Sequence, residues 1–143
     1  LASEAGFLDG VRLSNRPDAE AVICLHDATV TGISNALRRL MDQQPAPSAL
    51  FVANPNHYLT VTSRLCRMGR RVPEDISVVS RDDDPFLSYL FPSPTRYKSG
   101  SHAMAKSLLR PVIELLEGGV VTHRAIRIMP DFVRGDSLGP PGD

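Results

Sequence analysis

Hydrogen-bonding side chains stand directly after two apolar runs of the sequence. The β-branched run Ile76 to Val79 leads to three consecutive carboxylates, Asp82 to Asp84, and the run Leu50 to Ala53 ends at Asn54. Short apolar runs of this kind are typical of buried parallel strands. In an open α/β sheet, ligands bind at the carboxyl ends of the strands. The sequence therefore predicts a ligand-binding edge that carries Asn54 and Asp82.

The same residues also fit plainer roles. Asn54 precedes Pro55, which is tolerated in the first turn of a helix, so Asn54 is equally suited to cap that helix. Arg81 is placed either to form a surface ion pair with the aspartates or to accept an anionic ligand. Adjacent strand residues alternate faces, so Asp82 to Asp84 converge on a cation only if the strand has already turned. We therefore expect no metal site.

No catalytic constellation emerges from the residues. His26 and Asp27 follow an apolar run, and we interpret them as a loop or pocket wall rather than as a catalytic pair. The other histidines have no partner spacing, and no serine lies in a GxSxG nucleophile elbow. No glycine-rich loop opens a helix to hold phosphate. We expect neither an enzyme nor a cofactor.

Helices and strands alternate in the first part of the chain. We expect a helix over residues 4–15, a buried strand over 21–25, and a helix capped by Thr29 or Thr31. A strand over 49–53, a helix from Pro55 that ends near Gly69, and the central strand after Pro73 follow. Strands separated by helices and short connections predict an α/β fold: an open, doubly wound, mostly parallel sheet flanked by helices.

The alternation of apolar runs and helical patterns becomes less regular after Asp84. An aromatic-rich stretch over 86–91 is too irregular for a helix, and a short extended piece over 95–98 follows. A helix over 101–117 has an apolar stripe, and the alternation near the end predicts a strand over 125–134. The stripe comprises Met104, Leu108, Val112, Leu115 and Leu116. Residues 139–143 read as a flexible tail.

Composition limits the classes of protein that fit. The 143 residues suit one domain, and 16 basic against 16 acidic side chains leave no net charge for a nucleic-acid-binding surface. Cys24 and Cys66 lack the spacing of a zinc site or a disulfide framework. The start resembles no signal peptide, and no apolar stretch approaches 18 residues. We expect a soluble cytoplasmic protein without a membrane partner.

Several motifs, in order, resemble those of the LacI/GalR repressors. VPEDISVVSRDD, residues 72–83, is similar to the family signature VPEDISVVGFDD, and LFVAN, residues 50–54, looks like its Ala-Asn-Asp strand end. FPSPT at 91–95 resembles the PxLTTV crossover, and PDFVRGDS at 130–137 resembles the closing PxLVxRxS. Ala5-Gly6-Phe7 is similar to the RxxGF helix. The resemblance covers nearly the whole chain.

The resemblance implies a partial type I periplasmic-binding-protein-like domain. Residues 1–138 would be the C-terminal part of an effector-binding and dimerisation domain. Within it, 1–84 would form the C-terminal subdomain core, 95–129 would help complete the first subdomain, and 130–138 would be the return strand. The implied partners are a small-molecule effector and a second copy, with or without exchanged elements. DNA would be bound only through a headpiece absent from this chain.

The resemblance also assigns roles at the predicted edge. Asn54 matches the ligand-contacting asparagine of the family, and Asp82 matches the aspartate that accepts hydrogen bonds from sugar hydroxyls. An amide and a carboxylate together orient a polyol. We include Asp27, Arg81 and Ser3 as ligand-binding candidates. Ser3 stands where the family has a ligand-gripping arginine.

Further departures indicate an altered effector, because Pro55 replaces an aspartate and Ser80-Arg81 replaces a glycine and an aromatic residue. The resemblance favours the effector-binding part of a transcription regulator that works by subdomain closure. A solute-binding protein of a transporter is the alternative with the same fold. A phosphoacceptor enzyme is less compatible, because two acidic residues do not follow the first strand.

Overall fold

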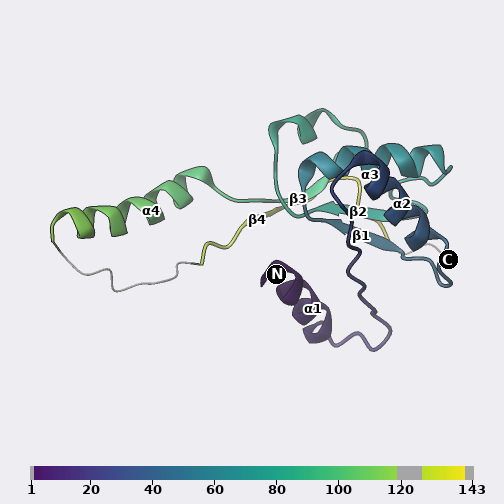
Figure 1. Ribbon diagram of the computed structural model, residues 1–143, viewed down its shortest axis with the longest axis horizontal. Helices are drawn as coiled ribbons and strands as arrows, with labels where there is room; N and C mark the ends of the chain where they lie inside the picture. The colour runs from purple at the N-terminus through teal and green to yellow at the C-terminus, as the bar shows by residue number, and fades with distance from the viewer. Residues whose placement is uncertain (1, 119–126, 141–143) are drawn as a thin grey trace.

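The computed structural model describes residues 2–118 and 127–140, which form an α/β body and one outlying helix (Figure 1). The elements in chain order are α1 (Ala2–Leu13), α2 (Val30–Met41), β1 (Ala49–Val52), α3 (Pro55–Arg67), β2 (Ser77–Ser80), a 3-10 turn η1 (Pro85–Tyr89), β3 (Thr95–Lys98), α4 (Ser101–Leu116) and β4 (Asp131–Val133). Within the described ranges, no helix is long and apolar enough to cross a bilayer.

The four strands form one sheet in the order β1-β2-β3-β4. β1 pairs with β2 and β2 with β3 in parallel, whereas β4 is antiparallel to β3. In the first pair, Ala49 lies opposite Ser77 and Val52 lies opposite Ser80. This arrangement confirms the mostly parallel α/β sheet that the alternation of elements predicts.

Helices cover both faces of β1. Leu50 and Val52 point into the core beneath α2 and α3, which lie side by side in Figure 1. Phe51 points to the opposite face, because successive strand residues alternate, and there it stacks on Phe7 of α1 with ring centroids 5.3 Å apart. The sheet is therefore doubly wound at β1.

Local sequence signals place α2 and α3 as expected. The Thr29 hydroxyl accepts a hydrogen bond from the Gly32 amide, and the Asn54 side chain accepts one from the Asn56 amide, so each helix has a side-chain cap. Gly69 ends the turn after α3 with a φ of 71°, a left-handed conformation that favours glycine. The buried core consists of Ile33, Leu37, Met41, Val52, Tyr58, Val61, Leu65, Ile76, Val78 and Leu87.

The buried strand predicted over residues 21–25 is wrong. This segment forms no ladder with the sheet, and the side chains of Val22 and Leu25 are 64% and 74% exposed. It contacts helix α2 instead: Cys24 donates from Sγ to the Ala36 carbonyl at 3.9 Å. An apolar run alone does not make a strand, because a strand also requires a neighbour that accepts its backbone hydrogen bonds.

The second half of the chain extends away from the body. β3 leads out of the sheet to α4, which stands apart in Figure 1, and β4 runs back. The large apolar side chains along α4 are exposed: Met104, Leu108, Leu109, Val112, Ile113, Leu115 and Leu116. The predicted stripe is therefore uncovered in this single chain.

The final strand is shorter than predicted. Residues 125 and 126 lie outside the described ranges, and 127–130 have no regular structure, so only Asp131–Val133 is a strand. The length of β4 is set by its pairing with β3, because the ladder runs from Arg96 opposite Val133 to Lys98 opposite Asp131. Side-chain alternation does not show where a partner strand begins.

A return segment, residues 135–139, fills the seam between β2 and β3. The buried Ser137 hydroxyl donates to the Val78 carbonyl and accepts from the Thr95 amide at 2.8 Å, so one side chain joins both strands. Gly139 donates its amide to Ser77 Oγ at 3.1 Å. A side chain at Gly135 would collide with the backbone of Ser93 and Pro94, so glycine is required there.

Candidate ligand-binding site

β1 and β2 present their carboxyl ends at one edge of the sheet. Val52 and Ser80 lie opposite each other in the parallel ladder, and Asn54 and Asp82 each follow two residues later. Both residues are partly exposed. The two polar groups predicted to share an edge therefore do so, at the end of the sheet where open α/β folds bind ligands.

Asn54 is the N-cap of α3. Its Oδ1 atom accepts a hydrogen bond from the Asn56 amide at 2.9 Å, so the capping role is real. Capping uses only the carbonyl oxygen of the amide, and the side-chain NH2 group has no partner among the described residues. That group remains available to donate to a ligand.

Asp82 pairs with its neighbour Arg81. Nη2 and Nε of Arg81 donate to Asp82 Oδ2 at 2.7 and 3.2 Å, and both side chains remain substantially exposed, at 38% and 48% respectively. Such an exposed pair contributes only about 0 to 1 kcal/mol to stability. The other carboxylate oxygen, Oδ1, has no partner within the described part of the chain.

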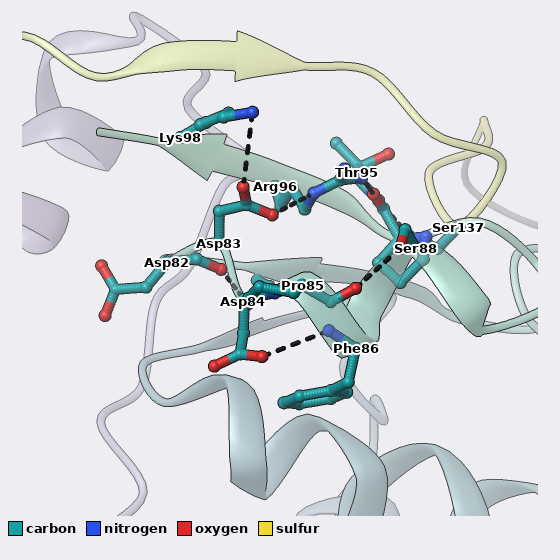
Figure 2. A network of polar contacts seen from close by, with 12 residues as sticks. Asp82, Asp83, Asp84, Pro85, Phe86, Ser88, Thr95, Arg96, Lys98 and Ser137 are labelled. Atoms are coloured by element: carbon teal, nitrogen blue, oxygen red, sulfur yellow. Dashed lines mark hydrogen bonds and ion pairs between the residues drawn. The ribbon is translucent and has the colours of Figure 1, made fainter. Parts of the chain in front are cut away.

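The three consecutive aspartates point in three directions and have different partners (Figure 2). Asp83 Oδ1 accepts from Arg96 Nε at 2.6 Å, and Asp84 Oδ1 accepts from the Phe86 amide at 3.2 Å, where it caps η1. In residues 2–118 and 127–140, no group of three or more metal-binding side chains gathers. The cluster is thus a set of separate contacts.

Asp27 organises the start of α2. Its Oδ1 atom accepts from the amide and hydroxyl of Thr29 at 3.0 and 2.7 Å, and these bonds lower the pKa of the carboxyl group. The carboxylate lies so close to Gly32 that any side chain there would collide with it. In the described part of the chain, the hydrogen bonds of the Asp27 carboxylate serve the loop that leads into α2.

His26 and His57 form a pair that the sequence interpretation missed. Their rings meet edge to face, with centroids 5.0 Å apart, and they line one cavity of about 280 Å³ together with Glu4 of α1. Burial, and secondarily the charge of His26, lowers the pKa of His57. His26 Nδ1 accepts from the Ala28 amide at 3.0 Å. The one available signal was that His57 follows Asn54 by three residues.

The remaining candidate, Ser3, is exposed on α1, one residue before Glu4 and hence near this cavity. The structure therefore gathers Asn54, His57 and His26 at the end of β1, with Arg81 and Asp82 at the end of β2. A larger hollow of about 490 Å³ lies elsewhere, between the end of α3 and residues 90–92, and includes none of these side chains.

Comparison with known proteins explains this arrangement. The periplasmic binding protein-like domain family matches residues 2–138. The chain belongs to this family. The HTH-type transcriptional regulator CelR of Thermobifida fusca is 26% identical over 113 residues, which are 79% of this chain and 33% of CelR.

Solved structures have the same fold. A LacI family transcriptional regulator from Bifidobacterium animalis subsp. lactis matches with a TM-score of 0.82 and 22% identity, over 97% of this chain and 50% of that one. A LacI family regulator from Arthrobacter sp. FB24, solved in complex with lactose, matches with a TM-score of 0.72 and 21% identity, over 93% and 48%.

These comparisons confirm the resemblance to the LacI/GalR regulators and the periplasmic-binding-protein-like fold. The chain spans about a third of the length of CelR and half of the compared structures. Membership of the periplasmic binding protein-like family therefore accounts for the mostly parallel sheet.

Proposed function

We propose that this chain is the effector-binding part of a LacI-family transcription regulator and that it senses a small polyol. The observation that carries the proposal is the parallel pair β1 and β2, which brings Asn54 and Asp82 to one edge with hydrogen-bonding atoms still unused. The Asn54 NH2 group would donate to the effector, and Asp82 Oδ1 would accept from its hydroxyl groups.

A sugar is the favoured effector. The lactose-bound regulator from Arthrobacter sp. FB24 supports this class, since it has the same fold as this chain. Arg81 supports a narrower alternative, an anionic sugar derivative, because its guanidinium lies at the same edge and, among the residues that the structure describes, pairs only with Asp82. Asp27, Ser3 and the two histidines would form the wall of the site.

The proposed domain organisation follows the path of the chain. Residues 1–84 would be the core of one subdomain, 95–129 would belong to the other, and 130–138 would return to the first. Support comes from α4, which stands apart from the sheet at the end of β3 (Figure 1). Effector binding between the subdomains would shift the regulator between open and closed states.

The partners of the whole protein follow from the same proposal. It would act in the cytoplasm and contact DNA through a headpiece outside this chain, and it would not be an enzyme. A homodimer would cover apolar surface that this chain leaves open, notably along α4 and at Tyr89 and Phe91, which are 87% and 96% exposed. Exchange of α4 between copies is one way to cover it.

Calorimetric titration of the full-length protein with lactose, cellobiose, ribose, a nucleoside and a purine tests the proposal. Asp82→Asn removes one charge without changing shape and should weaken sugar binding by about tenfold to a hundredfold, since a hydrogen bond to a charged group contributes about 1.5 to 3 kcal/mol. Asn54→Asp keeps the helix cap but removes the donor, and should also weaken binding.

Asp42→Asn is the matched control, because Asp42 is an exposed residue at the opposite end of α2. It should leave the affinity unchanged. Arg81→Gln separates the effector classes: it should preserve the binding of a neutral sugar and abolish the binding of an anionic one. Equal affinity of the wild type and Asp82→Asn would contradict the proposed site.

The full-length gene distinguishes the regulator from a transporter component of the same fold. A helix-turn-helix segment upstream of residue 1 is expected. A secretory signal peptide in its place would contradict the regulator and support a solute-binding protein.

A further inference from the structure

Asp83 joins the end of β2 to β3. Arg96 Nε donates to Asp83 Oδ1 at 2.6 Å, and the Lys98 ammonium lies 4.0 Å from Oδ2 (Figure 2). The side chains of Asp83 and Arg96 are only 21% and 18% exposed, about half the exposure of Asp82 and Arg81. The Asp83–Arg96 contact is thus less exposed to water than the Asp82–Arg81 pair, so solvent screens its charges less.

Arg96 is held in place by the surrounding backbone. Its Nη1 atom donates to the Pro94 carbonyl at 3.1 Å, while its backbone lies between Ser80 of β2 and Val133 of β4. The β2-β3 ladder has only two residue pairs, and the pair of Ser80 with Arg96 is the second. The Asp83 contact therefore extends the attachment of β3 beyond the end of the ladder.

The attachment lies where the chain leaves the sheet. After Lys98, only Ser99 and Gly100 precede α4, which stands apart from the body in Figure 1. Asp83 is also the residue next to Asp82, whose carbonyl accepts from Ser80 Oγ at 2.7 Å. One short segment thus carries both the candidate ligand contact and the contact to β3.

We propose that Asp83 and Arg96 form a positioning pair that sets the direction in which β3 carries α4 away from the sheet. Asp83 is accordingly no ligand group. The pair links the sheet edge at Asp82 to the part of the chain beyond β3. That the sheet and the part beyond β3 belong to two subdomains rests on the proposed function. A ligand that displaces the segment at Asp82 shifts the same contact.

Pulsed electron paramagnetic resonance on this 143-residue chain tests the pair directly. Spin labels at Asn35→Cys on α2 and Lys106→Cys on α4 report the distance between the body and α4. Cys24→Ser and Cys66→Ser remove the native thiols, and dilution with unlabelled chain removes distances between copies. In this background we expect a single narrow distance distribution.

Asp83→Asn and Arg96→Gln should each broaden the distance distribution, roughly doubling its width. Either change removes the contact that fixes the direction of β3, so α4 would sample more orientations relative to the sheet. The double variant should be no broader than either single variant, because both remove one contact. Two matched controls should retain the narrow distribution. They are Asp82→Asn, one residue away, and Lys98→Gln, because the Lys98 side chain is 59% exposed and its ammonium lies 4.0 Å from Asp83.

Hydrogen exchange of the α3 amides, which should be equal in all variants, separates a change of direction from general loss of stability. A broad distribution in the unmodified background would overturn the proposal, as would a narrow one in Asp83→Asn. No effector is present in this experiment. Its outcome is therefore independent of whether Asp82→Asn weakens sugar binding.

Discussion

The exposed stripe on α4 predicts that the isolated chain self-associates. Leu108 and Leu115 are 64% and 60% exposed. Full burial of a leucine contributes about 1.5 to 3 kcal/mol, so covering the exposed part contributes about 1 to 2 kcal/mol for each. Leu108→Gln with Leu115→Gln removes four leucines from a symmetric dimer, which should cost at least about 4 kcal/mol, or about a thousandfold in Kd.

Sedimentation velocity across a range of concentrations measures this change. We expect the wild-type chain to form dimers that the double variant loses. Arg110→Gln is the control on the same helix, because the Arg110 side chain is 80% exposed and forms an ion pair with Glu114 of the same helix. A wild-type chain that stays monomeric at high concentration would refute the reasoning, as would a double variant that associates as strongly as wild type.

Other substitutions test the packing and the charges of the body. Leu65→Ala should destabilise by about 2 to 5 kcal/mol in urea unfolding, because Leu65 is fully buried, whereas Leu13→Ala on exposed α1 should change stability by less than about 0.5 kcal/mol. Ser137→Ala should cost about 1 to 3 kcal/mol in the same assay, since it leaves the Val78 carbonyl without its hydroxyl partner. Arg71 lowers the pKa of Asp75 from 3.8 to about 2, so the stability difference between wild type and Asp75→Asn should be complete above pH 4 and disappear as the pH falls through 2 in acid titrations.

Local rules accounted for the elements whose ends are marked by single residues. Asn54 before Pro55 predicted the cap of α3, and the same asparagine marked the candidate edge. Gly69 predicted the left-handed end of that helix. These features depend on the few residues around them, so the sequence alone was sufficient.

Features that depend on distant partners were not predicted. Residues 21–25 have the composition of a strand, but whether the edge of β1 accepts them depends on the packing of α1 and α2. The contact of Asp83 with Arg96 joins residues 13 positions apart, and the rings of His26 and His57 meet because the loop before α2 and the first turn of α3 reach the same edge. Sequence spacing alone does not predict contacts between residues that only the folded chain brings together.

The return segment has a consequence for the order of folding. Ser137 supplies the hydroxyl that bridges Val78 and Thr95, at a separation of 59 residues from Val78. The chain supplies this hydroxyl only after both strands, so we expect a chain cut before Ser137 to keep the direct pairing of β2 with β3 but to hold the two strands together less firmly.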